Sequence, residues 1–137
     1  MGMLELMAAR LARGEVVEFR PTGSSMVPLI HSRQLVRVVP VDAAKLQVGD
    51  IVLAKVAGTV YLHLVSAVDR ARGRVQISNN RGRVNGWTSV AKVFGICTAV
   101  DGRERPRLED KSPHDLSGMT ATAPYLAASR ASRSLAR

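Results

Sequence analysis

Apolar residues follow two different periods along the chain. The first stretch, LELMAARLARG, has apolar residues at the spacing of one helix face and ends at Gly14, a residue that commonly stops helices. After it, six short runs rich in β-branched residues are separated mostly by turn residues, which is typical of strands. We therefore predict an all-β domain, a sandwich or barrel-like sheet, with a short N-terminal helix. The predicted strands are EVVEFR, QLVRVV, DIVLAKV, TVYLHLVSAV, GRVQIS and AKVFGICTAV.

Two of these predicted strands flank the dipeptide Ala57-Gly58, which predicts a two-residue hairpin turn. In that register Val52 faces His63 across the hairpin. Because side chains alternate along a strand, His63 lies on a mixed face, and Lys55 lies on the opposite one. We therefore do not expect Lys55 and His63 to act together. The same register pairs Ala54 with Tyr61 and Val56 with Thr59, and it places Val60, Leu62 and Leu64 on a plain core face.

The apolar period stops at Arg103. The stretch RERPRLEDKSPHDLSGMTATAP combines charges, prolines and small polar residues, so we predict a flexible tail. Its last part, YLAASRASRSLAR, has the composition of a short basic helix. The expected organisation is an N-terminal helix over 1–14, a β domain over 15–102 and a flexible basic tail over 103–137.

Length and composition describe a globular protein with one core. The chain has 137 residues, of which 46% are apolar and only 4% aromatic, so the core must be mostly aliphatic. No apolar run approaches the roughly 20 residues of a membrane span, and the N-terminus lacks the pattern of a secretory signal. We therefore expect a cytoplasmic protein with no membrane partner. The single cysteine, Cys97, lies in an apolar run and is expected in the core.

The formal net charge of +9 is spread over the β domain and the tail. Spread positive charge attracts nucleic acid without sequence preference. A solvated, arginine-rich surface explains the same charge and is the interpretation we favour. Because the chain has few aromatic side chains for base stacking, nucleic acid is the less favoured partner.

The stretch PTGSSMVPLI, residues 21–30, places two serines in a predicted turn. A serine hydroxyl becomes a good nucleophile when a neighbouring base takes its proton. His31 follows in the same loop and His114 lies in the predicted tail, whereas His63 lies on a strand, which holds catalytic geometry best. From spacing alone, a structural histidine with satisfied hydrogen bonds is the more common explanation of His63.

Four segments change this balance when they are taken together. GSSMVPLI, LVRVVPVD, LQVGDIVLAKV and TVYLHLV occur in this order between residues 23 and 65, and the resemblance they support covers roughly residues 16–100. This set resembles the S24/S26-type serine peptidases, which include LexA-type self-cleaving repressors and type I signal peptidases. The resemblance implies a LexA/signal-peptidase-like β-sheet sandwich, a polypeptide substrate and acyl-transfer cleavage of a peptide bond by a serine endopeptidase. It implies no cofactor and no metal.

The resemblance also assigns roles to residues. The serine before the methionine, Ser25, looks like the nucleophile, and the base position falls on His63. YLHLV is similar to the histidine branch of the superfamily, with Leu64 in place of the usual arginine. The backbone N–H of Ser25 is the expected oxyanion donor. Some signal peptidases add a hydroxyl two residues before the nucleophile, which is Gly23 here, so a second donor must come from Ser24 or from outside the motif.

The sequence departs from this family at the acidic partner of the base. Histidine-type members have a Gly-Asp-Asn-like segment after the next strand, but the matching stretch here is ISNNRG. An amide in place of the acid costs a serine protease about 10⁴ in rate. We expect Asn79 or Asn80 to orient His63 instead, as an asparagine does in Cys-His-Asn sites. A carboxylate from elsewhere in the chain is the alternative: Asp50, Asp69 or Asp101.

The stretch NNRGRVNGW, residues 79–87, predicts a structured loop with positive φ at Gly82 and Gly86. Two interpretations stay open. In one, Arg81 and Trp87 form a wall for the substrate near Asn80. In the other, this is a long turn with Trp87 as a core plug.

Three functions follow from these observations. The first is a stand-alone serine peptidase with a Ser25–His63 pair, and we hypothesise that its own or a neighbouring domain cleaves the tail at the small-residue unit Ala121-Thr122-Ala123. The second is a catalytically inactive S24/S26-like binding or regulatory module, which the missing acid favours. The third is a basic nucleic-acid binder, which rests on charge alone. The sequence does not assign an oligomeric state.

Overall fold

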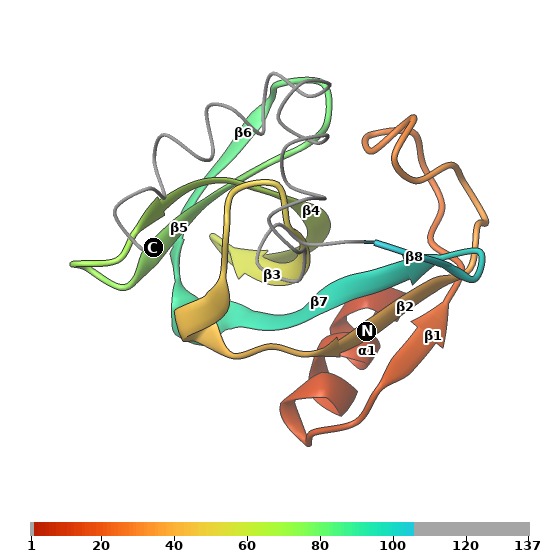
Figure 1. Ribbon diagram of the computed structural model, residues 1–137, viewed down its shortest axis with the longest axis horizontal. Helices are drawn as coiled ribbons and strands as arrows, with labels where there is room; N and C mark the ends of the chain where they lie inside the picture. Colours follow the sequence, from red (N-terminus) through yellow and green to blue (C-terminus); the bar gives the residue numbers. More distant parts are fainter. Residues whose placement is uncertain (1, 106–137) are drawn as a thin grey trace, which may run out of the picture.

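The computed structural model describes residues 2–105 and has a mainly β architecture with one N-terminal α-helix, which confirms the predicted fold class (Figure 1). The single sheet is antiparallel, with strand order β1-β2-β7-β3-β4-β5-β6, and β8 pairs with β7. The elements are α1 Met3–Ala12, β1 Val17–Phe19, β2 Val36–Pro40, β3 Ile51–Val56, β4 Thr59–Asp69, β5 Arg74–Ser78, β6 Val84–Ser89, β7 Val93–Val100 and β8 Arg103–Glu104, with short 3₁₀ turns at Ala43–Lys45 and Val90–Lys92.

The sheet curls on itself, and apolar side chains are buried against both of its faces. β6 and β3 are not neighbours in the sheet order, yet Thr88 Oγ1 donates a hydrogen bond to the Lys55 carbonyl at 2.7 Å. One apolar cluster lies between α1 and the sheet and includes Leu11, Val36 and Leu53. The other lies inside the curl of β3, β4 and β5. Aliphatic side chains dominate both clusters, as the composition predicts.

All six predicted runs contain a strand, and two further strands were not predicted. β6 occupies part of the stretch that the sequence assigned to a loop, and β8 pairs Glu104 with Ala99. The sheet therefore continues two residues past the boundary expected at 102. The rest of the expected flexible tail lies outside the described residues.

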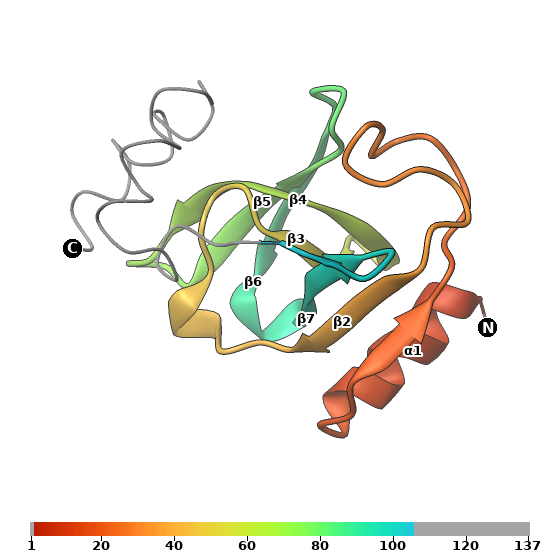
Figure 2. The same ribbon diagram turned by 45° about the vertical axis from the view of Figure 1, so that its right-hand side comes forward.

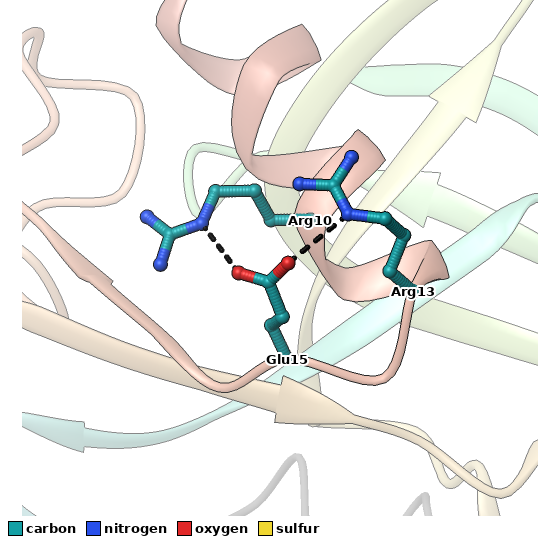
Figure 3. A network of polar contacts seen from close by, with 3 residues as sticks. All are labelled: Arg10, Arg13 and Glu15. Carbon is teal, nitrogen blue, oxygen red and sulfur yellow. Dashed lines mark hydrogen bonds and ion pairs between the residues drawn. The ribbon is translucent and has the colours of Figure 1, made fainter.

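The helix α1 ends as its sequence predicts. Gly14 has φ +86°, and its N–H donates to the Leu11 carbonyl at 2.9 Å. Glu15 follows and accepts from Arg10 and Arg13 at 2.9 and 3.0 Å (Figure 3). These two hydrogen bonds lower the pKa of the Glu15 carboxyl. The network lies on the surface, so it fixes the direction of the chain into β1 more than it stabilises the fold.

The β3–β4 hairpin has the predicted register. Val52 pairs with His63, and Ala57 and Gly58 both have positive φ, as a two-residue turn of this type requires. Lys55 is exposed, on the face opposite His63. The remaining predicted pairs are also present, Ala54 with Tyr61 and Val56 with Thr59.

The β5–β6 hairpin is irregular. Ile77 pairs with Gly86 and Ser78 pairs with Val84, so Asn85 is an extra residue that leaves the ladder. This is a β-bulge, which bends a strand and redirects a side chain. Gly82 and Gly86 have positive φ, as predicted. The loop of this hairpin lies beside the segment 21–33 (Figure 2), where the Asn80 N–H donates to the Ser25 carbonyl at 2.9 Å.

Two further expectations concern the core and the membrane. Cys97 is 3% exposed, as expected for a core residue, and burial raises the pKa of its thiol. Within residues 2–105, no helix is long and apolar enough to cross a bilayer.

Candidate functional site

The segment 21–33 is a closed turn that presents Ser25. Its ends are joined where the Arg33 N–H donates to the Pro21 carbonyl at 2.7 Å. Met26 and Ile30 are buried in the core beneath it, and the Ile30 N–H donates to the Met26 carbonyl at 2.9 Å. Two buried anchors and a closed base hold the half-buried Ser25 in one place above the sheet.

The structure brings Ser25 and His63 together. His63 lies on β4, is 9% exposed, and its Nε2 is 3.0 Å from Ser25 Oγ. The two residues are 38 positions apart in the chain, so this contact depends on the fold. It is the juxtaposition that a nucleophile and its base require.

Asn85 binds the second ring nitrogen of the imidazole. Its Oδ1 is 2.6 Å from His63 Nδ1. Because an amide oxygen only accepts, Nδ1 carries the proton and Nε2 keeps its lone pair toward Ser25. The bulge in β6 is what turns Asn85 out of the ladder and toward β4, on the far side of β5.

The surroundings keep His63 neutral and oriented. Burial lowers the pKa of its imidazole, and the hydrogen bond to Asn85 opposes part of this shift. Tyr61, two residues earlier on β4, stacks on the ring with centroids 5.0 Å apart and planes 23° apart. A neutral, fixed imidazole is available as a base at neutral pH.

The expectation that Asn79 or Asn80 orients His63 is corrected by these contacts. Asn79 Oδ1 accepts from the backbone N–H groups of Arg81 and Arg83, which closes its own loop. Asn80 Nδ2 donates to the Val27 carbonyl at 3.0 Å. Asn80 therefore connects the β5–β6 loop to residues 21–33, which we call the serine turn. The residue that orients His63 is Asn85. Asn85 was not predicted because residues 79–87 were expected to form a loop, where side-chain alternation does not indicate which way a residue points.

The candidate carboxylates have other partners. Asp69 pairs with Arg72, which lowers the pKa of its carboxyl, and Asp101 accepts from Leu35 N and Gln34 Nε2. Asp50 accepts from the Gln47 N–H at 2.9 Å. In the part of the chain that the structure describes, the hydrogen bond at His63 Nδ1 goes to an amide and not to an acid.

Two adjacent backbone N–H groups lie at the serine. Within residues 2–105, the N–H groups of Ser24 and Ser25 donate to no protein acceptor. The Gly23 N–H, by contrast, donates to Ser32 Oγ at 3.3 Å. Neither N–H therefore has a partner among the described residues, which is a requirement for a donor to an oxygen that develops negative charge.

A pocket of about 100 Å³ opens beside Ser25 and His63. Leu4 of α1 and His31 line it, and the sequence analysis did not predict either contribution. Arg81 and Trp87, the predicted substrate wall, do not line this pocket. Trp87 is 42% exposed, so it is not a core plug either. The other lining residues are Pro21, Thr22, Gly23, Met26, Ile30, Tyr61 and Leu62.

Among the described residues, the titratable side chains that line this pocket are His31, Tyr61 and His63. His114 lies outside the described residues. Among residues 2–105, no three His, Cys, Asp or Glu side chains gather as metal ligands would.

Comparison with known proteins gives no family for this chain. It matches no protein-family model, no curated protein and no solved structure. Function is therefore inferred from the geometry of Ser25, His63 and Asn85 and from the sequence motifs.

Proposed function

We propose that this protein is a serine peptidase of the S24/S26 type that cleaves peptide bonds by acyl transfer through Ser25 and His63. The observation that carries the proposal is the 3.0 Å contact between Ser25 Oγ and His63 Nε2. The ordered motifs between residues 23 and 65 support it, because they resemble that superfamily and place the nucleophile and the base at these two positions.

The first half of the reaction acylates the serine. Ser25 Oγ attacks the substrate carbonyl while its proton passes to His63 Nε2. The resulting imidazolium is held through Nδ1–H by the Asn85 amide oxygen. His63 then gives the proton to the departing amine as the C–N bond breaks. The product is an ester of Ser25, and one new N-terminus is released.

The second half repeats this chemistry with water. His63 takes a proton from water, the hydroxide attacks the ester, and Ser25 recovers its proton as the peptide carboxylate leaves. In both halves the N–H groups of Ser24 and Ser25 donate to the carbonyl oxygen as it becomes negative. Removing one such donor typically costs about 10²–10³ in rate, so each of these two groups should contribute substantially to catalysis.

A second function, a non-catalytic binding module of the same fold, is favoured by one observation. The group at His63 Nδ1 is a neutral amide, which fixes the ring but does not offset the charge of an imidazolium. A slow enzyme and a binding module therefore share this geometry, and an experiment must separate them.

A fluorophosphonate that labels active serines separates the two functions. When Ser25 Oγ bonds to phosphorus, fluoride leaves and His63 takes the proton, so the label reports the activated hydroxyl without a known substrate. We expect mass spectrometry to find the adduct on wild type and on Ser24→Ala, but not on Ser25→Ala. Ser24 is the matched control because it is the adjacent, more exposed hydroxyl.

Two results would contradict the peptidase proposal. Absence of label from folded wild type would mean that Ser25 is not activated and would favour the binding module. Label that persists in Ser25→Ala would place the reactive hydroxyl elsewhere.

A further inference from the structure

A groove beside the serine turn is lined entirely by uncharged residues. Its volume is about 540 Å³, and it lies between β4, β5, the first residue of β6 and three loops. This is unusual for a chain in which 23% of residues are charged and the net charge is +9. The lining residues are Leu29, Val48, Gly49, Leu64, Val65, Ser66, Gln76, Ser78, Asn79, Asn80, Gly82 and Val84.

The uncharged lining includes hydroxyl groups as well as apolar side chains. Ser66 is the extra residue of a bulge in β4, and its Oγ is 2.6 Å from Ser78 Oγ and 3.1 Å from Gln76 Oε1. Ser78 is 5% exposed. Hydroxyl and amide oxygens have spare acceptor sites, so the groove offers hydrogen bonds to a peptide backbone as well as apolar contact.

The described chain ends at the rim of this groove. After β8, Arg105 Nη2 donates to the Gly49 carbonyl at 3.2 Å, and Gly49 lines the groove. A second hollow of about 560 Å³ is lined by Arg105 and shares Leu29 with the groove. This second hollow carries charged side chains, including Asp101 and Glu104, so the residues that follow Arg105 start beside a charged hollow that adjoins the uncharged groove.

The sequence beyond Arg105 contains one long uncharged stretch. Residues 116–129, LSGMTATAPYLAAS, carry no charged side chain, whereas the residues on either side do. Ten residues, 106–115, separate this stretch from Arg105 and span up to about 35 Å when extended. A connection of this length gives an effective concentration in the millimolar range, on the order of 10⁻³ M.

We propose that residues 116–129 bind in this groove of the same molecule. Both partners are uncharged, the chain enters at the rim, and the connection is long enough to reach. The bound segment contacts Leu29 and Asn80, which belong to the serine turn and to the loop tied to it. This docking does not depend on hydrolysis by Ser25.

The test uses the full chain carrying Ser25→Ala, so that cleavage cannot remove the segment. A nitroxide is attached at Ala123→Cys, since the buried Cys97 is protected from labelling. We expect paramagnetic broadening of the Leu29, Leu64 and Val84 methyl signals that does not change on dilution. Placing two carboxylates in the segment, Met119→Glu with Leu126→Glu, should abolish it.

A pair of matched variants tests the groove itself. Val84 and Val16 are exposed to 50% and 48%, but only Val84 lines the groove. Val84→Arg should abolish the broadening and Val16→Arg should preserve it. No broadening in the parent, or broadening that persists in Val84→Arg, would overturn the proposal. Broadening that disappears on dilution would also overturn it, because the occupant would then be a second copy. Failure of fluorophosphonate labelling leaves all these results unchanged.

Discussion

The β3–β4 hairpin is regular, whereas the β5–β6 hairpin is not, and the candidate site needs both. β3 and β4 pair without interruption from Ile51 to Leu64 around a two-residue turn, and they deliver His63. β5 and β6 are joined by a five-residue loop, 79–83, and their ladder is broken at Asn85. Regular pairing fixes where the base lies, and the bulge fixes what faces its second nitrogen. Four predictions separate these two contributions.

The largest effect on activity is expected from a substitution in the regular hairpin, at His63. His63→Gln removes the base, and we expect kcat/KM for peptide cleavage to fall by about 10⁴ or more. Lys55→Gln is the control, because Lys55 lies on the neighbouring strand but is exposed on the other face. Activity in His63→Gln within tenfold of wild type would mean that another group takes the Ser25 proton.

The second largest effect is expected from substitutions of Asn85, which should change the rate of cleavage and its pH dependence. Because the pKa of His63 is lowered, its basic form persists below the usual histidine range, so activity should rise with pH to a midpoint in moderately acidic solution. Asn85→Asp places a carboxylate at Nδ1 and should move this midpoint upward and increase the plateau rate. Asn85→Leu should lower the rate about 10²-fold.

Two measurements check the role of Asn85. The pH–rate profile gives the midpoint in activity, and an NMR titration of the His63 ring gives the same midpoint without substrate. If Asn85→Asp leaves both unchanged, the 2.6 Å contact does not control the imidazole.

Replacing a glycine by alanine should destabilise the two hairpins by different amounts. At Gly86, φ is +140° and an added Cβ would lie 3.2 Å from Val56 Cγ1, whereas at Gly58 φ is +86° with open space. Gly86→Ala should therefore lower the free energy of unfolding by about 2–3 kcal/mol, and Gly58→Ala by about 1 kcal/mol. Urea denaturation measures both. Equal losses would indicate that β6 does not press against the β3–β4 turn.

The smallest effect is expected in the β5–β6 loop. Asn80→Ala removes the hydrogen bond to Val27 but keeps the backbone bond to Ser25, so kcat should fall about tenfold. Asn79→Ala is the matched control, since its side chain closes only its own loop. Both variants should lose about 1 kcal/mol of stability. A fall in kcat for Asn79→Ala equal to that for Asn80→Ala would remove the special role of Asn80.

Much of this arrangement is predictable from local sequence. Alternation around Ala57-Gly58 gives the register of His63, and the buried strands β3 and β7 are rich in β-branched residues. Such patterns depend on neighbours within a few positions, which is why the strands were predicted. Ser25 and His63 are 38 positions apart, and their juxtaposition was predicted from the family resemblance of the ordered motifs.

The strand β6 was missed because its sequence opposes its structure. Asn85 and Gly86 are poor strand formers, and only Thr88 of this strand is buried. The strand forms because tertiary contacts favour it: it pairs with β5, and Thr88 donates a hydrogen bond to the Lys55 carbonyl on β3. Missing β6 led directly to the wrong asparagine, since only the bulge aims Asn85 at His63.

The bulge has a consequence for how this chain can change over time. Asn85 does not take part in the ladder, so its identity is not constrained by the pairing of β5 and β6. One nucleotide change converts an asparagine codon into an aspartate codon. The electrostatic character of the imidazole is therefore separated by a single mutational step from an acid-assisted form, and that step leaves the architecture that supports it in place.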